Sequence, residues 1–230
     1  NPAPPRPSCR DGAGVRCFPM RDGALLAARP LASDGDLVVV YLHGIQSSAL
    51  ELEESARMLR ESAGAAVIPL DLRGHGLSAG PRGDVDHIGQ WEEDVADVVS
   101  ALREERPGAK VILAGHSMGG GIAMRYARRH AERHDVPGVD GYLLFAPHLG
   151  ERSPTAHPEP RGGAQGPAPI KVHVRRLIGL VMLNVAGVHG LDGLDTLAFD
   201  LPFEPPIRAY TFRALAGMAP DDYRAADAAH

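Results

Sequence analysis

The chain has 230 residues, of which 44% are apolar and 23% are charged, and its formal net charge at pH 7 is −5. This length suits one sizeable α/β domain with room for an insertion. The mildly acidic balance excludes the basic surface that a nucleic-acid-binding protein needs. The longest apolar run, residues 177–188, is too short to cross a bilayer, so the composition predicts a soluble protein.

Residues 1–14 are predicted to form a flexible lead-in, because the prolines clustered there favour extended backbone. The chain begins at Asn1 rather than methionine, so we expect an upstream segment to have been removed or left unrecorded. Cys9 and Cys17 leave two interpretations open. They form a disulfide in an exported protein, or they are unpaired thiols in a cytosolic one. The sequence leans toward export and leaves localisation otherwise open.

The first half of the chain alternates strand and helix patterns. Residues 15–31 read as a hairpin with Asp22-Gly23 at its turn. The continuous apolar runs 37–44 and 65–72 are typical of strands buried on both faces. Between them, the capping-box spacing that begins at Ser48 predicts the start of a helix.

The alternation continues through the middle of the chain. Residues 91–102 carry one apolar helical face, 110–115 a third buried strand, 118–134 a helix and 138–147 a fourth strand. This order predicts a mostly parallel, doubly wound α/β sheet with right-handed crossovers. Its ligand site is expected beyond the carboxyl ends of the strands.

The character of the sequence changes after His148. We assign 15–148 to the core of the domain and 149–208 to an insertion above the sheet edge, a cap or lid. Within the insertion, 174–188 is predicted to be an apolar helix, and loops and short turns follow it. Residues 209–230 are predicted to return to the core as a helix.

A Gly-x-Ser-x-Gly motif stands between the third strand and its helix, where residues Gly115, His116, Ser117, Met118 and Gly119 follow one another. A serine in such a strand-to-helix turn is exposed at a helix N-terminus, and the flanking residues must be small enough to let strand and helix approach. The pattern predicts Ser117 as a nucleophile. The alternative is a glycine-rich turn with an incidental serine.

His43 and Gly44 end the first buried strand, next to the loop that would supply an oxyanion donor. The N–H groups of Ile45 and Met118 are the candidates. His43 itself is interpreted as a structural hydrogen-bonding residue packed under the loop, with a role as base as the alternative. Asp71, after the next strand, is interpreted as bracing its turn through an interaction with Arg73, with a role as catalytic acid as the alternative.

No metal or organic cofactor is predicted. His130 and His134 share one helix face but lack the H-E-x-x-H order and a third ligand. No phosphate-binding loop or dinucleotide fingerprint follows a strand.

Three segments together carry a family resemblance: HG at 43–44, DLRGHGLS at 71–78 and GHSMGG at 115–120. In this order and at these strand ends they resemble the α/β-hydrolase superfamily, in particular its monoacylglycerol lipase, lysophospholipase and serine-aminopeptidase-like branch. The resemblance covers residues 15–147. It implies a Ser–His–Asp triad, an ester or amide acyl substrate and a lid, with Ser117 as nucleophile and the N–H groups of Ile45 and Met118 as oxyanion hole.

The acid and the histidine of that triad follow the serine in the family, each after a further strand. Residues 209–230 show no such strand. We therefore expect the C-terminal strands of the fold to be absent from this chain and to be supplied by a further segment or a second chain. Two alternatives remain: an unusual site with His148 as base, or a catalytically incomplete module that binds ligands.

The sequence thus predicts a serine hydrolase that cleaves carboxylic esters with lipid-like or other apolar acyl groups. Thioesterase, amidase and peptidase activities remain open as alternatives. The apolar helix 174–188 is interpreted in two ways, as a lid surface that meets micelles or bilayers transiently, or as part of the core.

Overall fold

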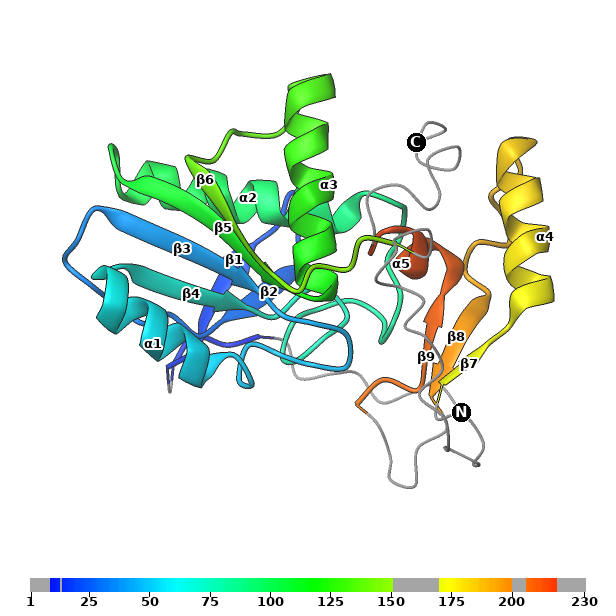
Figure 1. Ribbon diagram of the computed structural model, residues 1–230, viewed down its shortest axis with the longest axis horizontal. Coiled ribbons are helices and arrows are strands. Elements are labelled where there is room, and N and C mark those ends of the chain that lie inside the picture. The colour runs from blue at the N-terminus through cyan, green and yellow to red at the C-terminus, as the bar shows by residue number, and fades with distance from the viewer. Residues whose placement is uncertain (1–8, 13, 151–169, 200–205, 219–230) are drawn as a thin grey trace.

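The computed structural model describes residues 9–12, 14–150, 170–199 and 206–218 and contains a central six-stranded sheet (Figure 1). The strands are β1 (Arg16–Pro19), β2 (Leu25–Ala28), β3 (Leu37–Leu42), β4 (Ala66–Leu70), β5 (Lys110–His116) and β6 (Gly141–Phe145), in the order β1-β2-β4-β3-β5-β6. The pairs of the β1–β2–β4 edge are antiparallel, and those from β4 through β6 are parallel. The predicted mostly parallel sheet and its N-terminal hairpin are confirmed.

Helices cover both faces of this sheet. They are α1 (Glu53–Ala63), α2 (Gln90–Glu105) and α3 (Met118–Arg133). Alternate residues of β3 divide between two hydrophobic clusters: Val39 lies with the buried side of α1, and Val38 with those of α2 and α3. This two-sided burial explains why β3 reads as an unbroken apolar run instead of an alternating one.

The start of α1 differs from the sequence prediction. The helix begins at Glu53, and Leu52 stands at its N-cap position without a side-chain hydrogen bond. Ser48 lies in the turns before the helix, where Glu51 donates to its carbonyl oxygen. The Asp71 carboxylate accepts the N–H of Ala49 at 2.6 Å and holds this segment in turns. The predicted capping box is therefore wrong, because a tertiary hydrogen bond overrides the local signal.

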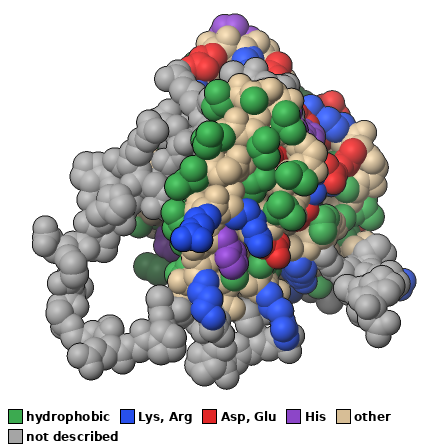
Figure 2. Space-filling model, turned by 90° about the vertical axis from the view of Figure 1, so that its right-hand side faces the viewer, with side chains coloured by type: hydrophobic (Ala, Val, Ile, Leu, Met, Phe, Trp, Pro, Cys, Tyr) green, Lys and Arg blue, Asp and Glu red, His purple; other side chains and the backbone are tan. Residues whose placement is uncertain are grey.

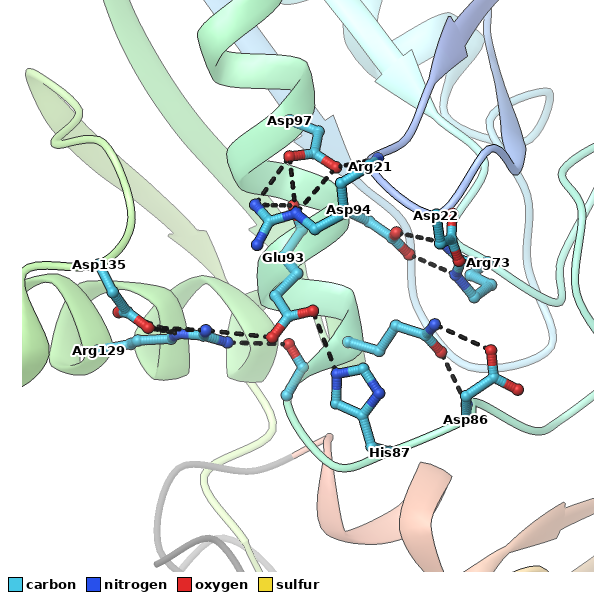
Figure 3. A network of polar contacts seen from close by, with 12 residues as sticks. Arg21, Asp22, Arg73, Asp86, His87, Glu93, Asp94, Asp97, Arg129 and Asp135 are labelled. Carbon is cyan, nitrogen blue, oxygen red and sulfur yellow. Dashed lines mark hydrogen bonds and ion pairs between the residues drawn. The ribbon is translucent and has the colours of Figure 1, made fainter. Parts of the chain in front are cut away.

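Ion pairs connect the N-terminal hairpin to α2 and α2 to α3 (Figure 3). The Arg73 guanidinium pairs with Asp94 at 2.6 Å and with Asp22 in the hairpin turn at 2.8 Å, and both Arg73 and Asp94 are buried. Arg129 of α3 binds Glu93 of α2 at 3.1 Å. Because the buried guanidinium has two carboxylate partners, its charge is compensated. Removal of one carboxylate would lower the free energy of unfolding.

A second group of elements, which we call the outer subdomain, comprises the described residues from 170 to 218. It contains β7 (Ile170–Val172), α4 (Val174–Val185), β8 (Asp195–Phe199), β9 (Ala209–Thr211) and the short α5 (Phe212–Ala216). The three strands form an antiparallel sheet in the order β7-β8-β9. The predicted helix at 174–188 is present but ends at Val185.

The sequence prediction missed the strands of this subdomain. Residues 195–199 are a strand instead of a loop, and 209–211 are a strand instead of the start of a helix. Strands of three to five residues are too short for an alternating pattern to be recognised. The parts of the predicted insertion and return helix at 151–169, 200–205 and 219–230 lie outside the described residues.

The outer subdomain is bonded to the core at several points. Asp84 accepts hydrogen bonds from the Thr211 hydroxyl and from the Arg213 guanidinium at 2.5 to 2.7 Å. Phe212 and Leu180 pack with Ile88 of the core in a small hydrophobic cluster. These contacts fix β9 and α5 against the loop that precedes α2.

The two cysteines, which the sequence left open, form a disulfide between Cys9 and Cys17. Cys17 belongs to β1, so the bridge fastens the N-terminal segment to the edge of the sheet that lies opposite β6. Among the described helices, none combines the length and the apolarity needed to cross a membrane.

Candidate active site

Ser117 lies in the tight turn between β5 and α3, with φ +50° and ψ −115°. A non-glycine residue in such a conformation costs about 1–3 kcal/mol and persists only where surrounding contacts hold it. The Ser117 N–H donates to the Phe145 carbonyl of β6 at 3.0 Å. Its carbonyl oxygen accepts from the N–H groups of Gly121 at 3.1 Å and His148 at 2.8 Å. Backbone hydrogen bonds on both sides therefore fix the turn.

Glycines surround this turn at the points where backbone segments touch. A Cβ on Gly115 would collide with the carbonyl oxygen of Gly119, and a Cβ on Gly119 would stand 2.7 Å from the His43 oxygen. A Cβ on Gly44 would stand 3.3 Å from the Ser117 Cβ. The strand, the helix and the loop after β3 can pack this closely only because these residues lack side chains.

Ser117 opens onto a cavity of about 500 Å³ between the core and the outer subdomain. From the core, Ile45, Met118 and His148 line it together with Ser117. Its other lining residues are all apolar: Ile170, Val172, Val174, Leu177, Leu197, Phe199, Leu215 and Met218. The structure thus brings four of the sequence-predicted site residues to one apolar pocket at the carboxyl ends of the strands.

The N–H groups of Ile45 and Met118 have no hydrogen-bond acceptor in the described part of the chain. Met118 is the first residue of α3, so its N–H lacks an intrahelical partner and lies at the positive end of the helix dipole. Ile45 directly follows Gly44, whose Cα lies against Ser117. Two donors beside one serine can bind an oxygen that becomes negatively charged.

The histidines differ in their surroundings. His148 is half-buried on the pocket wall, and its ring makes no hydrogen bond to any described residue. His116 lies on the other side of β5, in a groove that it shares with Tyr41 and Phe145. The motif therefore places Ser117 and Met118, but not His116, on the pocket.

His43 is completely buried, and both ring nitrogens bind backbone groups. Nε2 accepts the Leu72 N–H at 3.1 Å, so Nδ1 carries the proton and donates to the Gly44 carbonyl at 2.8 Å. Burial lowers the pKa of His43, and the Gly44 carbonyl and nearby carboxylates offset only part of that effect. The neutral His43 ring therefore stabilises the loop that carries Ile45 through its two backbone hydrogen bonds.

Asp71 is also buried, but its partners are not those that the sequence suggested. Its two carboxylate oxygens accept the N–H groups of Ala49 at 2.6 Å and Leu77 at 2.8 Å. Arg73 instead pairs with Asp94 and Asp22. The predicted Asp71–Arg73 interaction is wrong. Asp71 fastens the loop after β4 to the turns before α1.

Sequence reasoning missed two groups of residues at the site. One is the apolar wall from β7 and β8, which short strands conceal. The other is Gln46 and its hydrogen-bond partners in β9 and in the segment that leads into it. Gln46 and Ile207 lie 161 positions apart in the sequence, and no local pattern pairs them. Only the position of Gln46, directly after a candidate oxyanion donor, could have drawn attention to it.

The family of this chain follows from its similarity to known proteins. Residues 34–191 match the model of the family described as serine aminopeptidase, S33. The chain belongs to this family. The match spans β3 through α4, and it includes the three segments that carry the resemblance to α/β hydrolases.

Two of the curated proteins that this member of the serine aminopeptidase family resembles are lipases by name. The monoacylglycerol lipase of Mycolicibacterium smegmatis is 34% identical over 109 residues, which are 47% of this chain and 39% of the relative. Human monoglyceride lipase is 33% identical over 169 residues, 72% of this chain and 50% of the relative. The predicted monoacylglycerol-lipase-like branch is confirmed. The matched regions span 39 to 50% of these relatives.

Solved structures agree on the fold. The α/β hydrolase GrgF from Penicillium sp. sh18 has a TM-score of 0.53 at 21% identity, over 75% of this chain and 53% of its own. A structure from Agrobacterium vitis S4 has the same TM-score at 25% identity, over 92% of this chain and 70% of its own. The predicted α/β-hydrolase fold is therefore confirmed.

Proposed function

We propose that this protein is a serine hydrolase that cleaves carboxylic esters through an acyl-enzyme on Ser117. One observation carries the proposal. Ser117 occupies a strained turn at the head of α3, on an apolar cavity of about 500 Å³ that the candidate donors Ile45 and Met118 also line. This geometry supports a nucleophile elbow with an oxyanion hole.

The proposed reaction has two steps. Ser117 Oγ attacks the carbonyl carbon, its proton passes to a general base, and the N–H groups of Ile45 and Met118 hold the resulting oxyanion. The ester C–O bond breaks, and the leaving alcohol takes the proton. Water then attacks the acyl carbon, gives a proton to the base, and releases the acid while Ser117 recovers its hydrogen.

The general base is proposed to be a histidine outside the described residues, oriented by a carboxylate that also lies outside them. His148 is the alternative within the described chain. Its place on the pocket wall supports it. One observation argues against it. Among the described residues, its ring makes no hydrogen bond to Ser117 or to a carboxylate that would orient it.

The lining of the pocket supports an apolar acyl group. Leu177, Leu197 and Phe199 are among the side chains that face the cavity beyond Ser117. Burial of a methylene group is favourable by about 0.8 kcal/mol, so a longer acyl chain should bind more tightly here than acetate. Two curated relatives are lipases by name, which favours esters over the thioester, amide and peptide substrates that the same chemistry could cleave.

We further propose that the outer subdomain acts as a cap that meets lipid surfaces through α4. Ile178, Met182 and Val185 form a stripe along its outer face and are 56 to 68% exposed. Figure 2 shows apolar side chains along this side of the molecule with basic side chains gathered beneath them. Arg175 and Arg176 belong to the first turn of α4. An exposed apolar helix face with adjacent cations is typical of binding to anionic lipid surfaces.

A fluorophosphonate probe tests the catalytic proposal. We expect the full-length protein to be labelled at Ser117, the Ser117→Ala variant to remain unlabelled, and p-nitrophenyl octanoate to be hydrolysed faster than the acetate at equal concentration. The alternative is a ligand-binding module that keeps the turn without catalysis. It predicts no labelling and no ester hydrolysis by the full-length protein, and that result would refute the proposal.

A further inference from the structure

Gln46 has an unusual backbone and an unusual set of partners. Its φ is +61°, and only three other described non-glycine residues have a positive φ, Ser117 among them. A glutamine in this conformation is strained and persists only where surrounding contacts hold it. It directly follows Ile45, the proposed oxyanion donor that is not part of the Ser117 turn.

The side chain of Gln46 supplies the contact that holds it. Its Nε2 donates to the Ile207 carbonyl at 2.6 Å, and its Oε1 accepts the Ile207 N–H at 3.1 Å. One amide group therefore pairs with both polar groups of one backbone residue. Such a two-point contact fixes both distance and orientation, which a single hydrogen bond does not.

The Gln46 backbone is fixed as well. Its N–H donates to the Tyr210 hydroxyl at 3.2 Å, and Tyr210 is a buried residue of β9. His75 Nδ1 donates to the Arg73 carbonyl at 3.0 Å, so its Nε2 accepts the Tyr210 O–H at 3.0 Å. The hydroxyl thus accepts from Gln46 and donates to a ring that is itself anchored in the core.

Resting on the proposed function, we infer that Gln46 is a positioning residue. Its amide clamp to Ile207 aligns the Ile45 N–H with the oxyanion and couples that donor to the outer subdomain. The Gln46 N–H bonds to Tyr210, whereas the Ile45 N–H has no acceptor in the described part of the chain and Ile45 lines the pocket. If the segment at Ile207 moves, the donor moves with it.

The position of the Ile45 N–H matters because an oxyanion site tolerates only small displacements of its donors. A donor acts only when it lies within hydrogen-bond distance of the oxygen as charge develops, and loss of one donor lowers kcat about 10²- to 10³-fold. A displacement of about 1 Å can cost on the order of 10²-fold. The donor meets charge mainly in the transition state, so its displacement should change kcat and leave KM nearly unaltered.

The test compares four variants of the full-length protein in the hydrolysis of p-nitrophenyl octanoate. Gln46→Ala removes the clamp. Gln46→Gly removes it and also relieves the strain at positive φ. Tyr210→Phe removes the second anchor. Gln90→Ala is the matched control, because the Gln90 amide likewise makes two hydrogen bonds, to Asp86, but lies away from the pocket at the start of α2.

We expect kcat to fall about 10- to 100-fold in both Gln46 variants, with KM within about two-fold of wild type. Tyr210→Phe should lower kcat about 3- to 10-fold, and Gln90→Ala less than about two-fold. An alkylboronic acid, whose tetrahedral serine adduct places an oxygen at the oxyanion position, should lose affinity for the Gln46 variants by the same factor as kcat.

Different failures of this experiment have different meanings. If wild type is active and Gln46→Ala keeps its kcat, or Gln46→Gly restores it, the positioning role is wrong and the proposed function stands. If wild type is neither labelled by a fluorophosphonate nor active, the proposed function fails first. If Gln46→Ala does not fold, an unchanged kcat and boronate affinity in Tyr210→Phe overturns the inference.

Discussion

The backbone N–H of His148 donates to the carbonyl oxygen of Ser117 at 2.8 Å. This bond joins the loop after β6 to the turn after β5, and it involves no side chain. The two residues also line the same pocket. This backbone bond therefore stabilises the Ser117 turn and does not depend on the side chain at position 148.

Replacement of His148 separates this structural role from a catalytic role of its ring. In His148→Gln the backbone bond survives, so the turn should remain intact and fluorophosphonate labelling of Ser117 should continue. We expect kcat to fall less than about ten-fold, because the ring makes no hydrogen bond to a described residue. A fall of about 10³-fold or more, with the melting temperature unchanged, would instead make His148 the general base.

The close approach of strand and helix predicts a strong effect at Gly119. In Gly119→Ala the new methyl group would press against the backbone of Leu42 and His43. We expect the free energy of unfolding to fall by about 2 kcal/mol or more, and esterase activity to fall with it. Urea unfolding provides the measurement.

Gly179 provides the matched control, because a Cβ there meets nothing within 4 Å and the residue lies inside α4. Gly179→Ala should raise stability by about 0.5–1 kcal/mol, since alanine favours helix more than glycine does. Equal effects at the two positions would contradict the packing argument.

The sequence predicts the core of this protein well, for identifiable physical reasons. Buried parallel strands such as 37–42 produce continuous apolar runs, and the helices behind them have one apolar face. The Ser117 motif is local as well, because a tight turn restricts its own neighbours. Ile45 could be placed for a similar reason, since it follows a strand whose end must meet the serine.

The remaining features depend on contacts between distant segments. The three-residue strands β7 and β9 become strands because they pair with β8, and no pattern within three residues shows this. The same holds for Asp71, whose proximity to Arg73 in sequence suggested an ion pair. Two backbone N–H groups satisfy its carboxylate instead, while Arg73 turns toward α2.

The disulfide should stabilise the fold without affecting the site. Cys9 and Cys17 close a short loop, with a sequence separation of eight, at the sheet edge opposite β6. Constraint of the unfolded chain predicts a contribution of about 2.5 kcal/mol. The variant with both cysteines changed to alanine should lose up to that amount in urea unfolding and keep its kcat. A loss of activity in the folded variant would contradict this assignment.

His43 should make stability depend on pH. Its pKa in the folded protein lies below the ordinary 6.5, because burial disfavours the charged ring. Below about pH 6.5 the unfolded chain therefore binds a proton that the folded chain does not, and stability falls as pH falls. The slope for one such proton approaches about 1.4 kcal/mol per pH unit.

Urea unfolding between about pH 7.5 and about pH 5 measures this dependence. In His43→Gln the amide can still accept the Leu72 N–H but does not titrate. The variant should therefore lose stability less steeply than wild type over the same range. Identical slopes would show that His43 does not set the acid limit of the fold.

The outer face of α4 predicts a lipid-dependent effect. Ile178→Ser together with Met182→Ser should reduce binding to vesicles of phosphatidylcholine and phosphatidylglycerol about ten-fold, and leave hydrolysis of p-nitrophenyl butyrate unchanged. Met58→Ser is the control, because Met58 is 63% exposed on α1, away from this face. Equal vesicle binding by all three proteins would remove α4 as the contact.

The separation in sequence between the two walls of the pocket has a consequence for refolding. Ser117 and its neighbours gather through parallel pairing of β3, β5 and β6, whereas Gln46 must find Ile207 across 161 residues. Closing a long loop costs conformational entropy before the contact contributes favourable free energy, so such contacts tend to form slowly. After dilution from denaturant, helical circular dichroism should recover before esterase activity does. During that interval the Ser117 turn is formed, but the pocket for the acyl group is not yet complete.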